Sequence, residues 1–260
     1  MATINSSSAF LHQRAERGNK YTSGRLLIDA GSTQFPGAAV LAVGGARRGG
    51  AGYINYRSRE KLPTELVLHA YPDVVPVTDD EIDDKFDAIL IGPGSPAITS
   101  LPRARRLIVD GGALSFIEKP AHDDEIWILT PHEGEIKKMG FDPSDRKSCA
   151  IDAARSLHVI LLLKGFHSII ATPSGIVHID EIGGSELSTA GTGDVLAGLI
   201  SSMIASHKPE SIDKAAEITA HAVEIFSNAA QSSVRKKRPL VATDLIEEIP
   251  RLLAQGGTFL

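Results

Sequence analysis

The segment Ser-Thr-Ala-Gly-Thr-Gly-Asp, which ends at Asp194, joins a flexible turn to a carboxylate at the start of an apolar stretch. Gly191 and Gly193 let successive backbone N–H groups point into one concavity, and a helix N-terminus adds partial positive charge there. Such a place suits a phosphate. Phosphoryl transfer to an alcohol needs a carboxylate beside it, because the carboxylate deprotonates the hydroxyl while the N–H groups stabilise the phosphoryl charge.

The spacing around Asp194 also has a purely structural interpretation. Asp194 could cap a helix, and the glycines could form a tight turn without binding any ligand. The segment is not a P-loop, because no Lys-Ser or Lys-Thr pair follows the glycines.

Two further polar groups follow expected strands. His132 and Glu135 stand three residues apart just after a strand, where open α/β sheets place their ligands. Lys164 and Gly165 end a buried-looking strand, and a lysine there would neutralise nucleotide phosphates. The alternatives are a buried structural histidine at 132, a solvated helix-start acid at Glu133, and a lysine whose amine reaches solvent from the strand end.

The elements that position these residues alternate between strand and helix. Strands are expected at residues 25–28, 53–56, 86–91, 107–110, 127–130 and 159–164. Several lack polar alternation, as strands covered on both faces do, which predicts a parallel sheet with helices on both sides and strand C-termini along one edge. Residues 167–179 break this pattern. Two β-rich pieces flank the turn residues 172–175, which predicts an antiparallel hairpin near the sheet edge.

Helices are expected over residues 37–46, from Asp194 onward, over 214–231 and over 241–254. The helix after Asp194 has an apolar face that predicts burial. For the last helix, Thr243 or Asp244 is the expected cap. The helix over 37–46 is rich in small residues, which allows a close approach either to a ligand or to the sheet.

The bulk composition is that of an ordinary globular protein. The 260 residues are 42% hydrophobic and 23% charged, with a formal net charge of −5. This charge gives no general attraction for nucleic acid or anionic membranes, and no apolar run approaches the roughly 20 residues of a membrane span. The single cysteine, Cys149, excludes an intrachain disulfide and fits a reducing compartment. We expect a mobile N-terminal tail over residues 1–18 and one domain over 19–260.

The segment Ala-Gly-Thr-Gly-Asp-Val-Leu-Ala-Gly resembles the signature of the ribokinase-like superfamily, and more closely that of the ADP- or ATP-dependent NAD(P)H-hydrate dehydratases. The segment Thr-Pro-His-Glu-Gly-Glu, residues 130–135, is the second stretch that specifically resembles this family. Four more segments fit in the same order: 24–56, 89–96, 107–114 and 161–179. The resemblance covers residues 18–231. It implies a ribokinase-like three-layer α/β/α sandwich with a mostly parallel central sheet and the hairpin near its edge.

The resemblance implies a repair activity. The S epimer of hydrated NADH or NADPH would be phosphorylated on its ring hydroxyl by ADP or ATP with Mg²⁺, and phosphate would then be eliminated. Asp194 would be the catalytic base, and Glu135 would reach the metal through water. The implied phosphate- and nucleotide-binding residues are Lys164, Gly165, Thr189, Ala190, Gly191, Thr192 and Gly193. The implied substrate-binding residues are Gly31, Ser32, Pro36, Gly37, Ala38, Gly92, Gly94, His132 and Asp194. A separate epimerase, a tetramer and a cytoplasmic location are also implied.

Two positions depart from the family's pattern. Gly112 stands where a second acid is usual, which leaves Asp110 as the carboxylate of that segment, and Asp29 has no evident role. Three other functions stay open. Residues 92–97 fit G-x-G-x-x-A with Asp110 downstream, as in a Rossmann-type oxidoreductase, although two prolines interrupt the glycine loop. A kinase of a thiazole or pyrimidine alcohol, or a non-catalytic nucleotide-binding regulator, could share the fold.

Overall fold

The computed structural model describes residues 18–77, 85–95, 98, 100–117, 124–235 and 239–254. All but the last residue of the expected N-terminal tail, and Pro96 and Ala97 of the glycine loop, lie outside these ranges. Within them, no helix is long and apolar enough to cross a membrane.

Nine strands of the described chain form one sheet in the order β3-β2-β1-β4-β5-β6-β7-β8-β9. The strands are β1 (Arg25–Asp29), β2 (Tyr53–Arg57), β3 (Val75–Pro76), β4 (Ala88–Ile91), β5 (Arg106–Val109), β6 (Ile126–Leu129), β7 (Ile160–Leu163), β8 (Ile169–Ala171) and β9 (Val177–Ile179). All pairs from β3 to β7 are parallel, with Leu26 of β1 opposite Ile54 of β2 and Ala88 of β4. The β7–β8 and β8–β9 pairs are antiparallel, which confirms the predicted hairpin at the sheet edge.

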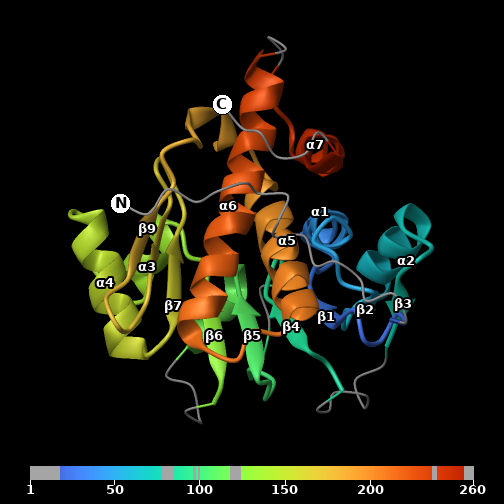
Figure 1. The fold of residues 1–260 in the computed structure, drawn as a ribbon. Coiled ribbons are helices and arrows are strands. Elements are labelled where there is room, and N and C mark those ends of the chain that lie inside the picture. Colours follow the sequence, from blue (N-terminus) through green and yellow to red (C-terminus); the bar gives the residue numbers. More distant parts are fainter. Residues whose placement is uncertain are drawn as a thin grey trace.

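Helices cover both faces of this sheet (Figure 1). They are α1 (Pro36–Ala46), α2 (Lys61–Ala70), α3 (Glu133–Lys138), α4 (Arg146–Leu157), α5 (Thr192–His207), α6 (Ile212–Arg235) and α7 (Ala242–Ala254), with short 3₁₀ turns η3 (Gly111–Phe116) and η4 (Ser185–Leu187). Side chains alternate between two cores because successive strand residues point to opposite faces. Leu26 and Ile28 pack with α1, α5 and α6, whereas Leu27 packs on the face covered by α4. The three-layer α/β/α architecture is as predicted.

The closest contact between helices joins α1 and α5. A Cβ atom on Gly198 of α5 would lie 1.9 Å from the Ala42 carbonyl oxygen, and one on Gly45 of α1 would lie 2.1 Å from the Val195 carbonyl oxygen. Neither position has room for a larger residue. The small residues of α1 therefore allow a close approach to α5, while Ala39, Ala42 and Val43 also pack in one core with the sheet residues Leu26 and Ile28.

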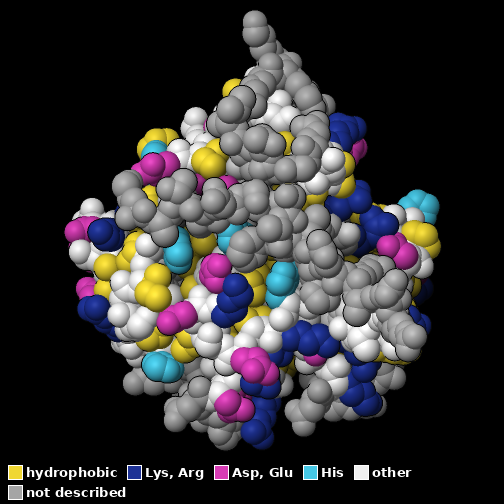
Figure 2. Space-filling model, in the orientation of Figure 1, with side chains coloured by type: hydrophobic (Ala, Val, Ile, Leu, Met, Phe, Trp, Pro, Cys, Tyr) yellow, Lys and Arg dark blue, Asp and Glu magenta, His cyan; other side chains and the backbone are white. Residues whose placement is uncertain are grey.

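The prediction for the start of α7 needs correction. The residue before the helix is Val241, and Asp244, in the first turn, accepts the Val241 N–H at 3.0 Å. Asp244 thus satisfies a donor at the helix start from inside the helix. On the face of the molecule that Figure 2 shows, acidic and basic side chains of the described residues are interspersed.

Candidate active site

Three polar side chains meet where three neighbouring parallel strands end. Asp110 follows β5, Thr130 follows β6 and Lys164 follows β7, and these strands are adjacent in the sheet. The Lys164 Nζ lies 2.6 Å from the Asp110 Oδ1, and the Thr130 hydroxyl donates to the same oxygen at 2.7 Å. Asp110 is only 3% exposed, so these two donors offset the cost of burying its charge. The carboxyl edge of the sheet therefore holds a buried ion pair, where open α/β sheets bind ligands.

Lys164 stands among three carboxylates. Burial disfavours its charged form, but the charges of Asp110, Glu135 and Asp194 outweigh that effect and raise the pKa of the Lys164 ammonium. Its side chain is 17% exposed, so the ammonium lies at the wall of the site rather than deep in the core. The lysine therefore keeps its positive charge at neutral pH, which suits it to neutralising a phosphate.

Asp194 has the opposite perturbation. Burial and the charge of Asp110 raise the pKa of Asp194 to about 7, with a smaller contribution from Glu135, while Lys164 acts to lower it. A carboxyl group that exchanges its proton near neutral pH is matched to general-base work.

The turn before Asp194 leaves backbone donors available. Gly191 has φ of 87°, in the left-handed region that glycine adopts without strain. The Thr192 hydroxyl donates to the Leu187 and Thr189 carbonyls, which fixes the turn. No side chain caps α5, and among the described residues no acceptor is found for the N–H of Gly193 or Asp194. This N-terminus has the properties of an anion site.

Lys164 and the glycine turn lie against each other. A Cβ atom on Gly193 would be 3.3 Å from the Lys164 Nζ. The ammonium, the unpaired N–H groups and the Asp194 carboxylate therefore belong to one small region. The arrangement can hold a phosphate and present a base to a neighbouring hydroxyl.

Helix α1 flanks the same turn. A Cβ atom on Gly191 would lie 2.3 Å from the Leu41 Cδ1. Pro36, Gly37 and Ala38, predicted to bind substrate, form the first turn of α1, one turn before Leu41. Gly37 is exposed, and a Cβ atom there would contact nothing within 4 Å. The N-terminal end of α1 therefore offers open space beside the Gly191 turn.

The other predicted substrate-binding residues form two interlocked loops. The Gly31 N–H donates to the Pro93 carbonyl at 2.7 Å, and the Ser32 hydroxyl donates to the Gly94 carbonyl at 2.8 Å. A Cβ atom on Gly92 would lie 2.0 Å from the Asp110 carbonyl oxygen, so this glycine is required by close packing. The loops after β1 and β4 are thus fixed to each other and to the ion-pair segment.

His132 and Glu135 begin α3 together. The His132 Nδ1 accepts the N–H groups of Gly134 and Glu135 at 2.9 and 3.2 Å, and a Glu135 carboxylate oxygen accepts the His132 N–H at 2.8 Å. This reciprocal pair is a capping box with histidine in the usual place of serine. The His132 side chain is 58% exposed, so the alternative of a buried structural histidine is wrong. Its Nε2 lies 3.6 Å from the Glu135 Oε1.

Gly165 packs against Arg146, whose hydrogen bonds hold the loop after β7 in place. A Cβ atom on Gly165, whose φ is 142°, would lie 2.8 Å from an Arg146 nitrogen. Arg146 donates to the His167 carbonyl at 3.0 Å and lies 3.0 Å from Glu133. Glu133 is therefore an ion-pair partner and not only a solvated acid.

The two predicted nucleotide-binding residues before Gly191 lead into the glycine turn. Thr189 donates to the Leu240 carbonyl at 3.3 Å, and Ala190 follows it.

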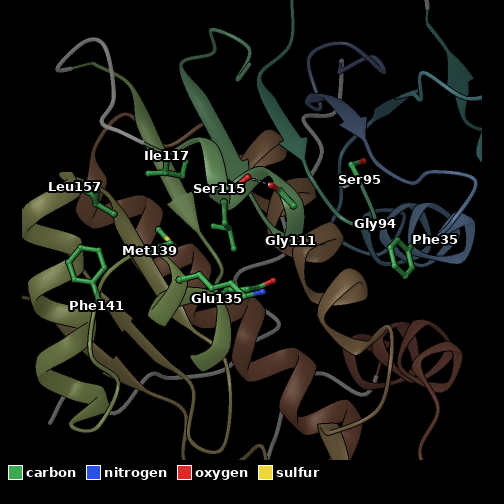
Figure 3. Close-up of a pocket in the computed structure, with 13 residues that line it drawn as sticks. Phe35, Gly94, Ser95, Gly111, Ser115, Ile117, Glu135, Met139, Phe141 and Leu157 are labelled. Atoms are coloured by element: carbon green, nitrogen blue, oxygen red, sulfur yellow. Dashed lines mark hydrogen bonds between the residues drawn. The ribbon is translucent and has the colours of Figure 1, made fainter. Parts of the chain in front are cut away.

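A cavity of about 680 Å³ opens beside Glu135. Loops that follow β1, β4, β5 and β6 line it, and they include Gly94 and Gly112. In Figure 3, Glu135 reaches toward the middle of the cavity, with Phe35 and Ser95 on one side and Phe141 and Leu157 on the other. The departure at Gly112 thus removes a side chain from the cavity wall.

The candidate site fits a divalent cation that arrives together with a nucleotide. Within the described ranges, no three His, Cys, Asp or Glu side chains come together as a metal-binding group. Yet the carboxylates of Asp110, Glu135 and Asp194 act together on one ammonium, which leaves the region rich in negative charge. Mg²⁺ commonly uses one or two carboxylates, waters and substrate phosphates, so the residues fit an ion that arrives with a nucleotide.

Thr130 was not considered as a site residue in the sequence analysis, and Asp110 was noted only as the remaining carboxylate of its segment and in the Rossmann alternative. Asp110 and Thr130 each end an expected strand, just as Lys164 does. The signal that could have identified them is this shared position on adjacent parallel strands.

Asp29, which had no evident role in the sequence, has a structural one. Its carboxylate accepts a hydrogen bond from Arg57 at 3.1 Å between the ends of β1 and β2. The described residues between β4 and β5 contain no α-helix, whereas a Rossmann glycine loop leads directly into one, so the Rossmann alternative is not favoured.

Comparison with known proteins assigns the chain to a family. The family model of NAD(P)H-hydrate dehydratase matches residues 26–251. The chain belongs to this family. The NAD(P)H-hydrate dehydratase match spans every residue of the candidate site described above.

Relatives of the NAD(P)H-hydrate dehydratase family agree in sequence and in structure. The chain is 32% identical to the ADP-dependent (S)-NAD(P)H-hydrate dehydratase of Bacillus subtilis, over 77% of this chain and 79% of that protein. A Bacillus subtilis ADP/ATP-dependent NAD(P)H-hydrate dehydratase, co-crystallised with ATP and Mg²⁺, superposes with a TM-score of 0.83 and 27% identity, covering 97% and 99% of the two chains.

A bifunctional NAD(P)H-hydrate repair enzyme of Salinibacter ruber is 32% identical over 91% of this chain, but the match covers only 49% of that enzyme. The chain therefore spans about half the length of the bifunctional relatives that it matches.

Proposed function

We propose that this protein dehydrates the S epimer of hydrated NADH or NADPH, with ADP or ATP as the phosphoryl donor. The observation that carries the proposal is the position of Asp194, beside the uncapped N-terminus of α5 and near the Lys164 ammonium. The pKa of Asp194 there is raised to about 7. Family membership supplies the substrate class, and the site supplies the means of activating a hydroxyl.

The terminal phosphate of the donor would bind at the glycine turn. The N–H groups of Gly193 and Asp194 point away from the body of α5, as all first-turn donors do. The Lys164 ammonium, 3.3 Å from a Cβ atom on Gly193, adds a full positive charge. Thr189, Ala190, Gly191, Thr192 and Gly165 would complete the nucleotide-binding surface. These groups stabilise the charge that spreads over the phosphoryl oxygens during transfer.

The acceptor would bind on the α1 side of Asp194. The first turn of α1, the interlocked loops after β1 and β4, and His132 would surround the hydrated nicotinamide ring. Asp194 takes the proton of the ring hydroxyl, and the hydroxyl oxygen forms a bond to the terminal phosphorus as the donor's bridging oxygen leaves. Phosphate then departs with the C–O electron pair, driven by the ring nitrogen lone pair, and loss of the adjacent ring proton restores the reduced dinucleotide.

Mg²⁺ would supply positive charge to the nucleotide phosphates when bound. Glu135 would hold it through water, because one carboxylate oxygen already accepts the His132 N–H and fixes the orientation of the group. We also propose a functional link to an NAD(P)H-hydrate epimerase, a cytoplasmic location and a tetrameric assembly, on family resemblance alone.

The test is an assay of the purified protein with hydrated NADH and either ADP or ATP. The expected result is the return of absorbance by the reduced ring, together with release of phosphate and of AMP or ADP. Accumulation of a stable phosphorylated alcohol instead would favour the small-alcohol kinase. No reaction with either donor, in a preparation shown to be folded, would overturn the proposal.

A further inference from the structure

The cavity beside Glu135 has two unlike ends. One end is lined by Gly94 and Phe35, close to the segments predicted to bind the substrate ring. The other end extends to Met139, Phe141 and Leu157, which present sulfur, aromatic and aliphatic surface. The mechanism proposed above uses no residue of this far end.

The far end belongs to the acceptor side of the site. Glu135 lines the cavity and also acts electrostatically on Lys164 and Asp194, so the cavity begins at the reacting centre. Neither Lys164 nor Gly193, the groups assigned to the donor phosphate, lines it. Its walls come instead from the loops after β1, β4, β5 and β6. A donor nucleotide held at the glycine turn is therefore the less suitable occupant.

We propose that the far end binds the adenosine half of the acceptor dinucleotide, with Lys138 contacting the ribose phosphate of the NADPH form. This inference rests on the proposed function, which supplies a dinucleotide acceptor. A volume of about 680 Å³ is in the range of ligand pockets, and an adenine ring can pack between the Phe141 ring and the Met139 sulfur. Lys138 is the exposed cation among the lining residues, and none of the described residues forms an ion pair with it.

The experiment measures binding without turnover, by the fluorescence of the reduced nicotinamide ring. The probes are reduced nicotinamide mononucleotide, which lacks the adenosine half, NADH and NADPH. Phe141→Ala should weaken NADH binding about tenfold, as expected from the loss of the aromatic surface that would cover the adenine ring, and leave the mononucleotide unchanged. Ser115→Trp should give the same pattern by filling the cavity from an exposed position of η3, which protects the test from a folding defect in Phe141→Ala.

A matched pair of lysine variants tests the phosphate contact. Lys138→Ala should weaken NADPH binding about two- to fivefold relative to NADH, the range for an exposed ion pair. Lys137→Ala, next to it on α3 but outside the cavity lining, should change neither. Equal weakening of NADPH and NADH by Lys138→Ala would overturn the assignment of this lysine.

The adenosine assignment fails if both cavity variants bind NADH as the wild type does, or weaken the mononucleotide equally. It also fails if they instead weaken ADP or ATP, because the donor would then occupy the cavity. Such results with a wild type that still dehydrates hydrated NADH would leave the proposed function intact. An inactive wild type would count against the proposed function alone, since the binding pattern is measured independently.

Discussion

Replacing Asp194 by Asn should make the protein more stable while it removes the activity. The carboxyl group of Asp194 has its pKa raised from 3.8 to about 7, mainly by burial and by the charge of Asp110. Ionising it in the folded protein therefore costs up to about 4 kcal/mol more than in the unfolded chain. Partial exposure to solvent reduces this to about 2 kcal/mol. Asparagine has nearly the same shape and carries no charge, so the variant avoids this cost.

The size of this stabilisation depends on pH, and its direction follows from the raised pKa of Asp194. Because the folded-state pKa is the higher one, the folded protein binds more protons than the unfolded chain between pH 3.8 and about 7. The contribution of Asp194 to stability is thus complete below pH 3.8 and is lost as the pH rises to about 7. Urea unfolding at pH 8 should show Asp194→Asn more stable by about 2 kcal/mol, and the difference should vanish toward pH 4.

Two results would refute this reasoning. Equal stability of wild type and variant at pH 8 would mean that Asp194 ionises without cost, and that no pKa shift prepares it as a base. Measurable dehydration by Asp194→Asn at a rate within tenfold of the wild type would exclude general-base catalysis by this residue. Asp213→Asn is the matched control, because Asp213 is an exposed acid in the first turn of α6 and its replacement should change stability by less than about 0.5 kcal/mol.

Further predictions concern the elements around Asp194. Lys164→Met should lower stability by about 3 kcal/mol by leaving Asp110 buried without its cation, and the double variant with Asp110→Asn should recover much of that loss in urea unfolding. Gly198→Ala should cost about 2–3 kcal/mol because its methyl group would strike the Ala42 carbonyl, whereas Gly37→Ala, with open space around it, should be neutral or slightly stabilising by thermal unfolding. His132→Ala should cost about 1 kcal/mol through the lost cap of α3, measured by the same unfolding curves.

The sequence pattern was sufficient for most of the sheet because the signal of each of those strands is local. Each buried parallel strand is a short apolar run, and the six predicted runs coincide with β1, β2, β4, β5, β6 and β7 to within one or two residues. The two-residue strand β3 carried no such signal, since Val75–Pro76 is too short to show a period. The α4 helix, with mixed composition over residues 146–157, was also not predicted.

The candidate site was only partly predictable for a different reason. The glycine turn and Asp194 are contiguous in the chain, so their spacing revealed them. The ion pair joins Asp110 and Lys164, which are 54 residues apart and come together only because β5, β6 and β7 are adjacent in the sheet. No local pattern specifies that adjacency. From the sequence alone, a histidine that caps α3 could not be distinguished from a buried structural histidine, because either one can stand directly after a strand.

The position of Asp194 follows from helix packing that lies outside the reacting centre. Asp194 and Gly198 are four residues apart on α5 and share one face, and Ala38 and Ala42 are related in the same way on α1. The missing side chain of Gly198 lets the two helices approach until its Cα faces the Ala42 carbonyl. The contacts of Gly191 with Leu41 and of Gly45 with Val195 advance together along the two helices, so α1 and α5 run in the same direction and begin on the same side of this contact. A glycine in the middle of α5 thus sets how closely the helix that carries the proposed base approaches the helix proposed to bind its substrate.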